Sequence, residues 1–317
     1  MMNIVVASDD NFVQHCTIML TSLLENNKDD INIYLITQGI SEVNNNIINN
    51  IVTKYGANYF YICINSNIFN ELPMPDLSAL SHISIATYFR LLIPTLLPIS
   101  ISKVLYLDCD IIVRKSIDEL WSTNIDNYAV AAVYQIAEWN IDAINRLKYP
   151  FSYGYFNAGV LLMNLNYWRE NNVSEKLFKY LIDNKNNIIY HDQDALNGVL
   201  FDKCFRLPCK WNLLTSYFRK DILEITEKVN GKIIENNMDY KQQIVTEIID
   251  PTVIHFVSKP KPWDKGCTHP FKFEYFKYAK LTPWYKFAVN ESITFKVKQI
   301  IKKILNKSPY FHIKLNK

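Results

Sequence analysis

Short apolar segments alternate with helical patterns along the first half of the chain. Four segments are rich in β-branched or aromatic residues, as buried strands are: residues 4–7, 33–36, 59–62 and 104–107. Apolar residues recur at helical spacing over residues 16–24 and again over 43–51, where Ser41 is suited to the helix N-cap. This strand, helix, strand alternation predicts an α/β fold with a mainly parallel sheet covered on both faces.

Composition restricts the class of protein. The 317 residues are 49% apolar and 21% charged with only 7 Gly, which excludes a disordered chain, a collagen-like repeat and a disulfide scaffold. No run of 18 apolar residues occurs and the first residues lack the pattern of a signal peptide, so we expect a cytoplasmic protein. The six cysteines form no C-x-x-C pair, so we expect buried reduced thiols.

Two acidic residues directly follow the predicted strand 104–107. Ligands of such sheets bind beyond the carboxyl ends of the strands, and Asp108 and Asp110 stand there, as Asp9 does after the first strand. Carboxylates on alternate residues of an extended segment point to one side and can bind a divalent cation together with nucleotide phosphates. The alternative is a solvated strand end followed by a turn. The chain has no G-x-G-x-x-G or P-loop motif, which argues against dinucleotide-binding dehydrogenases and P-loop kinases.

A later segment, residues 253–263, favours the cation interpretation. An apolar strand ends at His255, and a serine and two lysines held by two prolines follow it, a stiff basic turn suited to phosphate oxygens. Taken alone, the histidine could belong to the core and the lysines to a solvated loop. Together with Asp108 and Asp110, His255 makes an Asp/Asp/His site, whose nitrogen ligand favours Mn²⁺ over Mg²⁺.

Six blocks of sequence, in this order, resemble glycosyltransferase family 8, which includes bacterial lipopolysaccharide α-galactosyl- and α-glucosyltransferases and glycogenin. The blocks are residues 7–11, 84–91, 104–110, 155–162, 192–197 and 255–263. The resemblance covers roughly residues 3–265. It implies a GT-A fold, a Rossmann-like nucleotide-sugar-binding α/β architecture. It also implies a UDP-hexose donor, dependence on Mn²⁺ with Mg²⁺ as the alternative, and retention of the α configuration.

The resemblance also implies roles for individual residues. The uridine would be contacted by Ala7, Ser8, Asp9 and Asn11. The diphosphate side would be contacted by Arg90 and Lys261, and the cation would be held by Asp108, Asp110 and His255. The donor sugar would be surrounded by Asn157, Ala158, Asp192 and Gln193, and Cys109 and Ser258 complete the predicted donor site.

Asp192 and Gln193 are the predicted catalytic residues. Asp192 can only accept hydrogen bonds and so suits sugar hydroxyls, although a structural pair with His191 is the alternative. Retention suggests a carboxylate nucleophile on the far face of the sugar. The family places Gln193 there, and an amide is a poor nucleophile. We therefore expect front-side attack, in which the departing phosphate assists deprotonation while the cation and Lys261 neutralise its charge.

Two departures from the family pattern affect different parts of the site. Ser258 stands where many members have Gly, which could loosen a tight approach of the backbone to phosphate. Tyr134 and Gln135 follow the predicted strand 128–133 where a galactosyltransferase relative has an acceptor-binding Asp. We therefore expect the donor pocket to follow the family more closely than the acceptor pocket.

The C-terminal region differs in charge from the rest of the chain. Residues 271–317 contain 11 Lys, no Arg and 2 Glu, net +9, whereas the preceding 270 residues carry net −6. Aromatic residues interleave with lysines over 271–287, and apolar residues follow helical spacing over 297–305. This pattern is typical of an interfacial helix on anionic lipid. A nucleic-acid patch, disfavoured by the absence of Arg, and a helix packed on its own domain are the alternatives.

These observations predict a catalytic domain over residues 1–265 and a basic, aromatic, membrane-associating region over residues 266–317. The leading hypothesis is a retaining hexosyltransferase that moves galactose or glucose from a UDP-sugar onto a lipid-linked lipopolysaccharide or lipooligosaccharide core sugar. It would act as a peripheral protein on the inner face of the cytoplasmic membrane, without nucleic acid as a partner. The alternatives are a soluble transferase acting on protein or polysaccharide and a sugar-nucleotide-binding module without turnover.

Overall fold

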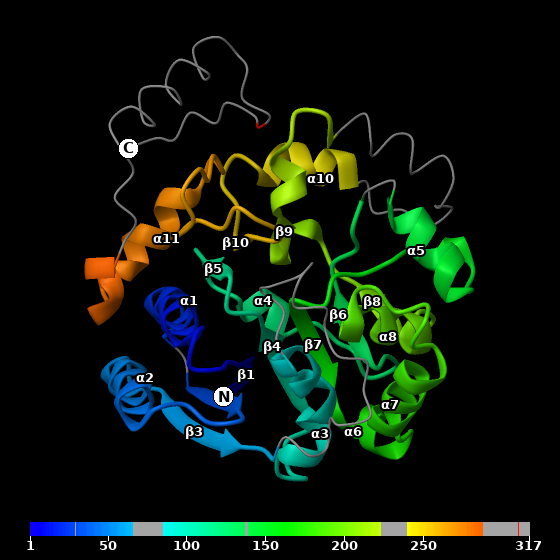
Figure 1. The fold of residues 1–317 in the computed structure, drawn as a ribbon, viewed down its shortest axis with the longest axis horizontal. Coiled ribbons are helices and arrows are strands. Elements are labelled where there is room, and N and C mark those ends of the chain that lie inside the picture. Colours follow the sequence, from blue (N-terminus) through cyan, green and yellow to red (C-terminus); the bar gives the residue numbers. More distant parts are fainter. Residues whose placement is uncertain (29, 66–84, 137–138, 223–239, 288–309, 311–317) are drawn as a thin grey trace.

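A seven-stranded sheet forms the centre of the molecule. The computed structural model describes residues 1–28, 30–65, 85–136, 139–222, 240–287 and 310 (Figure 1). In spatial order the strands are β3 (Asn58–Cys63), β2 (Ile31–Thr37), β1 (Met2–Ala7), β4 (Lys103–Leu107), β7 (Val160–Asn164), β6 (Val130–Ala132) and β8 (Cys204–Arg206). All neighbouring pairs are parallel except the two pairs of β7. The predicted mainly parallel α/β sheet is confirmed.

Helices follow the strands as the sequence pattern predicts. α1 (Val13–Asn26) connects β1 to β2, and α2 (Glu42–Lys54) connects β2 to β3. The Ser41 side chain caps α2 by accepting a hydrogen bond from the backbone N–H of Asn44. The other α-helices are α3 (Ile93–Leu96), α4 (Asp118–Trp121), α5 (Trp139–Leu147), α6 (Leu165–Glu170), α7 (Val173–Asp183), α8 (His191–Leu200), α10 (Tyr240–Glu247) and α11 (Lys272–Ala279). The 3₁₀ helices are Ile85–Leu92, Phe151–Tyr153, Cys209–Trp211, Thr215–Phe218 and Pro283–Phe287.

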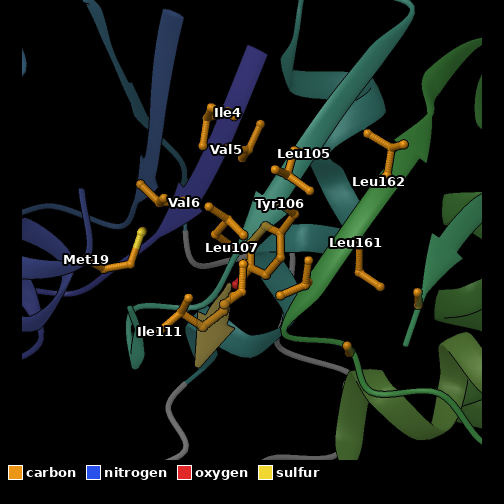
Figure 2. Packing of buried hydrophobic residues seen from close by; sticks show 14 of the residues in the cluster. Ile4, Val5, Val6, Met19, Leu105, Tyr106, Leu107, Ile111, Leu161 and Leu162 are labelled. Carbon is orange, nitrogen blue, oxygen red and sulfur yellow. The ribbon is translucent and has the colours of Figure 1, made fainter. Parts of the chain in front are cut away.

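The strands at the centre of the sheet are buried on both faces. Ile4, Val5 and Val6 of β1 are each 0% exposed. Figure 2 shows them beside Leu105 and Leu107 of β4, with Leu161 and Leu162 of β7 on the other side of β4. Helices on both faces of a parallel sheet explain why these strands have continuous apolar sequences instead of alternating ones.

The strand order places polar residues of distant segments at one edge. From β1 the chain continues outward to β2 and β3 and then returns to β4 on the opposite side of β1. The carboxyl ends of β1 and β4 are therefore adjacent, the position at which open α/β sheets bind ligands. Because β7 runs antiparallel to β4, the residues that precede β7 also reach this edge, and the Asp108 N–H donates to the Gly159 carbonyl at 2.9 Å.

A second, three-stranded sheet has the order β5-β10-β9 and lies above the large sheet in the view of Figure 1. Its strands are β5 (Ile111–Val113), β10 (Val253–His255) and β9 (Leu213–Leu214). His255 pairs with Ile111 on one side and with Leu214 on the other. Since β5 begins directly after Asp110 and β9 directly after Asn212, this register brings both residues next to His255.

The cysteines are free thiols, and most of them are buried. Cys16, Cys109, Cys209 and Cys267 are buried as expected. Cys204 is partly exposed, and Cys63 is exposed because it ends β3, the edge strand of the large sheet. The expectation of burial is therefore wrong for Cys63.

The first part of the basic C-terminal region packs in the core. Phe271, Tyr275 and Tyr278 are all buried. α11 lies against α1, where the Tyr275 hydroxyl is 2.7 Å from Nδ1 of His15 and the Tyr278 hydroxyl accepts from the Asn26 side chain at 2.8 Å. These aromatic residues are not available to a membrane. The predicted helix over residues 297–305 lies outside the described residues, so membrane association is a prediction for that segment.

Two phenylalanines test this packing. Phe271 is 0% exposed and its ring centroid lies 5.5 Å from that of Phe218, whereas Phe273, two residues on, is 40% exposed. We expect Phe271→Ala to lower the free energy of unfolding by about 3–5 kcal/mol because it leaves a cavity, and Phe273→Ala by about 0.5 kcal/mol or less. Urea unfolding followed by circular dichroism measures both. Equal effects would contradict the packing of this region in the core.

Candidate active site

A cleft of about 700 Å³ lies at the carboxyl ends of β1 and β4. Every predicted donor-site residue except Asn11 lines it: Ala7, Ser8, Asp9, Arg90, Asp108, Cys109, Asp110, Asn157, Ala158, Asp192, Gln193, His255, Ser258 and Lys261. Asn11 is exposed just after them, and its backbone N–H donates to the Asp9 carboxylate at 3.0 Å. The structure thus gathers residues from six separate parts of the chain in one place.

Asp108, Asp110 and His255 converge on one point in this cleft. Each offers a ligand atom, and the three atoms lie within 4.8 Å of one another. Nε2 of His255 is 3.0 Å from Oδ1 of Asp110 and 3.8 Å from Oδ2 of Asp108. The imidazole is buried, whereas both carboxylates are partly open to the cleft. Two carboxylates and one imidazole nitrogen at this spacing are a suitable ligand set for a divalent cation.

The second oxygen of each carboxylate is held by a neighbouring group. Oδ1 of Asp108 accepts from the Tyr106 hydroxyl at 2.9 Å and pairs with Arg90 at 2.9 Å. Oδ2 of Asp110 pairs with Nζ of Lys261 at 2.5 Å. Burial raises the pKa of Asp110, but Lys261 and His255 outweigh it and hold that pKa below its usual range. Asp110 is therefore ionised at neutral pH, as a cation ligand must be.

The backbone at Gly159 comes so close to the predicted cation ligands that no side chain fits at this position. A Cβ added to Gly159 would lie 2.2 Å from Cε1 of His255 and 2.8 Å from Oδ2 of Asp108. On the other side, Nδ1 of His255 lies 2.9 Å from the side-chain oxygen of Asn212. The imidazole is thus held in place with its other nitrogen directed at the carboxylates, as a metal-binding histidine requires.

Arg90 connects Asp108, a predicted cation ligand, to Asp192 on the predicted sugar side of the cleft. Its Nε lies 3.0 Å from Oδ2 of Asp192, and another of its nitrogens donates to the Ala158 carbonyl at 2.5 Å. Thr87 donates to the other oxygen of Asp192. Burial raises the pKa of Asp192 to about 6, although Arg90 and Thr87 act in the opposite direction. The partners of Asp192 are therefore Arg90 and Thr87, while His191 lies 3.3 Å from the Tyr88 hydroxyl.

Gln193 is held on both sides of its amide. Its oxygen accepts from the Asn157 side chain at 2.9 Å and from the Ala158 backbone N–H at 3.0 Å. Its nitrogen donates to the Tyr155 hydroxyl at 3.0 Å. An amide fixed in this way is suited to orienting a substrate.

The turn after β10 has the backbone conformation expected of a glycine. Ser258 has φ +67°, in the left-handed region that favours Gly. Lys261, three residues on, donates through Nζ to the Phe256 carbonyl at 2.6 Å as well as to Asp110. The replacement of Gly by Ser noted in the sequence therefore does not prevent the turn from bringing Lys261 to the cation ligands.

Several residues that line the cleft were not predicted. They include Phe12, Tyr106, Tyr190, Thr215, Ser216, Arg219 and Tyr310, together with Gln135, which was considered only as a departure from the family pattern. Most of them come from short segments with little hydrophobic periodicity, so the sequence carries no signal for them. Asn212 was missed for the same reason, since it follows a single turn of 3₁₀ helix.

Comparison with known proteins identifies similar sequences and structures. The model of a family described as glycosyl transferase family 8 matches residues 3–267. General stress protein A of Bacillus subtilis (strain 168) is 30% identical over 89% of this chain and 94% of its own length. A lipopolysaccharide 1,2-glucosyltransferase of Escherichia coli is 25% identical over 96% of this chain and 83% of its own.

Among solved structures, the galactosyltransferase LgtC in complex with donor and acceptor sugar analogues superposes with a TM-score of 0.77. It is 25% identical, and the match covers 94% of this chain and all of that one. The predicted GT-A fold is confirmed by this similarity. The prediction that the chain is a glycosyltransferase is confirmed by the family match together with the relatives.

The raised pKa of Asp192 makes a prediction about stability. The folded-state value of about 6 exceeds the ordinary 3.8, so the folded protein binds this proton more tightly than the unfolded chain does. Stability from this group is present at low pH and is lost as pH rises between these two values, by about 3 kcal/mol in total. Asp192→Asn removes this dependence. The free energy of unfolding of Asp192→Asn minus that of the wild type should therefore become more positive as the pH rises from 4 to 7.

Urea unfolding at several pH values measures this difference. Asp183→Asn is the matched control, because the Asp183 side chain is 52% exposed. A constant difference between Asp192→Asn and wild type across this pH interval would contradict the raised pKa.

Proposed function

Because the chain belongs to glycosyltransferase family 8, we propose that it transfers galactose or glucose from a UDP-sugar to an acceptor sugar with retention of the α configuration. The observation that carries the proposal is the convergence of Asp108, Asp110 and His255 in the cleft beyond β1 and β4. A nucleotide diphosphate leaves with negative charge, which a cation at this point would neutralise. The edge of the sheet where they meet is where α/β folds bind nucleotides.

Mn²⁺ is the proposed cation, with Mg²⁺ as the alternative. An imidazole nitrogen beside two carboxylates favours the softer ion. Asp108 and Asp110 would bind it through the oxygens that Arg90 and Lys261 leave open to the cleft. Lys261 would contribute a second positive charge to the departing phosphates from the same side.

The nucleotide would bind along the end of β1. Oδ1 of Asp9 accepts from the backbone N–H groups of Asn11 and Phe12, at 3.0 and 3.1 Å. This fixes the carboxylate and leaves its second oxygen to accept from the donor nucleotide. Ala7 and Ser8, both buried beside it, would form the wall against the uracil.

The sugar side supports front-side attack over a covalent intermediate. Asp194 is fully buried and accepts from the Tyr155 hydroxyl, from Arg146 and from the backbone N–H groups of Ile189 and Tyr190. A carboxylate saturated in this way is a structural anion and a poor nucleophile. Asp192, the other acidic residue on this side, pairs with Arg90 and would accept sugar hydroxyls.

The acceptor that we propose is a lipid-linked core sugar of lipopolysaccharide or lipooligosaccharide. The relatives named for lipopolysaccharide transfer support this class of acceptor. Gln135 lines the cleft and contributes an amide to the proposed acceptor side. A soluble transferase for protein or polysaccharide is the alternative.

The first test is turnover by the purified chain. With UDP-galactose, UDP-glucose and UDP-N-acetylglucosamine offered separately, one hexose donor should give UDP release that depends on Mn²⁺ and on a lipid-linked acceptor. Asp108→Asn, Asp110→Asn and His255→Ala should each lower this turnover at least about 1,000-fold, because each removes a cation ligand. Asp183→Asn is the matched control and should retain it.

Retained turnover of Asp110→Asn without a divalent cation would contradict the proposed site. Equal UDP release with a soluble polysaccharide acceptor would favour the soluble alternative.

We also propose that the protein binds the inner face of the cytoplasmic membrane. Five lysines occur over residues 296–307, and each can contribute about 1 kcal/mol near anionic lipid. In the part of the chain that the structure describes, no helix is long and apolar enough to cross a bilayer. The proposed attachment depends on charge and on an amphipathic segment.

Replacing these five lysines by glutamine tests the attachment. The variant should sediment less with vesicles that contain anionic lipid and should lose activity on vesicle-embedded acceptor. Its turnover of a small soluble acceptor should be nearly unchanged, because the donor and cation residues lie before residue 265. High salt should release the wild type from the same vesicles. Equal loss of both activities would contradict a membrane role for this segment.

A further inference from the structure

Asn212 is a buried polar residue with no place in the predicted site. It is 0% exposed and immediately precedes β9. Its side-chain oxygen lies 2.9 Å from Nδ1 of His255, and its side-chain nitrogen donates to Oδ1 of Asn157 at 2.8 Å. Asn212 thus connects a cation ligand with a residue on the sugar side of the cleft.

The backbone determines the direction of these hydrogen bonds. The Gly159 backbone N–H lies 2.9 Å from Oδ1 of Asn157, and a backbone N–H can only donate, so this Asn157 atom must be the amide oxygen. The Asn212 atom that faces the same oxygen must then be its nitrogen. The Asn212 oxygen is left facing His255, where it can only accept, so Nδ1 of His255 carries a proton.

A second anchor on the far side of Asn157 gives the same direction. The Asn157 nitrogen donates to the oxygen of Gln193, which the Ala158 backbone N–H also meets. The Gln193 nitrogen then donates to Tyr155, whose hydroxyl proton goes to the Asp194 carboxylate at 2.8 Å. Ionised carboxylates only accept, so donors and acceptors alternate without conflict from Asp194 to His255.

Each ring nitrogen of His255 has a neighbouring oxygen that could accept its proton. A neutral imidazole has one N–H, and Nε2 faces Oδ1 of Asp110 at 3.0 Å while Nδ1 faces Asn212 at 2.9 Å. A cation bound between the carboxylates and Nε2 needs the lone pair on that nitrogen. The ring proton must then stand on Nδ1, where Asn212 supplies the acceptor.

We propose that Asn212 is a positioning residue that holds the proton of His255 on Nδ1, keeps Nε2 available to the cation, and links the cation ligand to the Asn157–Gln193 pair on the sugar side. This inference rests on the proposed function, because it takes the cation site as given. It assigns Asn212 two separable effects. The oxygen acts on cation affinity, and the nitrogen acts on the orientation of Asn157 and, through it, on Gln193.

Two substitutions separate these effects. Asn212→Leu removes both groups at similar volume, and we expect Mn²⁺ affinity to fall about 10–100-fold, as for other residues that orient metal ligands, together with a fall in kcat. Asn212→Asp keeps an oxygen for the Nδ1 proton but cannot donate to Asn157. We expect its Mn²⁺ affinity to stay within a few-fold of wild type while kcat falls and KM for the donor changes little.

The affinity for Mn²⁺ and the position of the proton on His255 can both be measured without an activity assay. Mn²⁺ titration followed by electron paramagnetic resonance gives the affinity of each variant. Long-range ¹H–¹⁵N correlation spectra of the cation-free protein at high pH report which ring nitrogen is protonated, with His255→Gln to assign the signal. We expect the Nδ1–H form in wild type and Asn212→Asp, and the Nε2–H form in Asn212→Leu.

Asn27→Leu is the matched control. Asn27 is also a buried asparagine that bridges two groups, the Leu23 carbonyl and the Ile117 backbone N–H, but it lies at the end of α1. We expect the Asn27→Leu variant to have a lower free energy of unfolding than the wild type and the same affinity for Mn²⁺. If Asn212→Leu fails to fold, Asn212→Asp alone tests the proposal, because we expect its kcat to fall while its affinity for Mn²⁺ stays near that of the wild type.

Two outcomes are distinguished by the His255→Gln variant. If wild type and His255→Gln bind Mn²⁺ equally, the cation site of the proposed function is wrong. If His255→Gln loses affinity while Asn212→Leu keeps wild-type affinity and the Nδ1–H form, only the role of Asn212 is overturned. A fall in Mn²⁺ affinity of Asn212→Asp equal to that of Asn212→Leu would also overturn it.

Discussion

The pairing of β10 with β5 is the constraint on which the site depends. His255 stands opposite Ile111, the residue directly after Asp110, so the antiparallel register alone sets the imidazole beside the carboxylate. A shift of one residue would turn His255 to the other side of the strand. The same strand pairs with β9 and thereby brings Asn212 to the opposite side of the ring. The small sheet therefore brings Asp110, His255 and Asn212 together, while the large sheet supplies Asp108.

Two basic side chains pair with three aspartates around the cleft. Arg90 is shared between Asp108 and Asp192, and Lys261 is bound to Asp110. Burial still raises the pKa of Asp192 to about 6, so this carboxylate is held in a position that is unfavourable for the charged form. Stability given up at such a position is common where a substrate completes the hydrogen bonding. Asn212 is buried behind this site, in contact with His255 and Asn157.

The sequence was informative where an apolar run ends in a polar residue. Residues 104–107 and 253–254 identify Asp108 and His255 in this way, because strands of an α/β sheet deliver the residues that follow them to one edge. The order of family-like blocks then connected these distant segments. The structure brings the residues of these segments together in one cleft.

The pairing of strands that are distant in the sequence could not be predicted from the sequence. The antiparallel direction of β7 and the register of β10 depend on which distant strands meet, and no local pattern encodes that. The alternation of lysines and aromatic residues near the C-terminus predicted a membrane-binding surface. In the structure, Tyr275 and Tyr278 instead pack on α1 and hydrogen-bond to His15 and Asn26. Hydrophobic spacing does not tell which surface a helix covers.

The central claim is that His255 and the two aspartates form one cation site. Electron spin-echo envelope modulation of Mn²⁺ bound to the purified chain tests it directly, because a coordinated imidazole nitrogen modulates the echo. We expect nitrogen modulation in the wild type and its loss in His255→Ala, with the ion still bound weakly by Asp108 and Asp110. Mn²⁺ that is bound tightly without any nitrogen modulation in the wild type would contradict it.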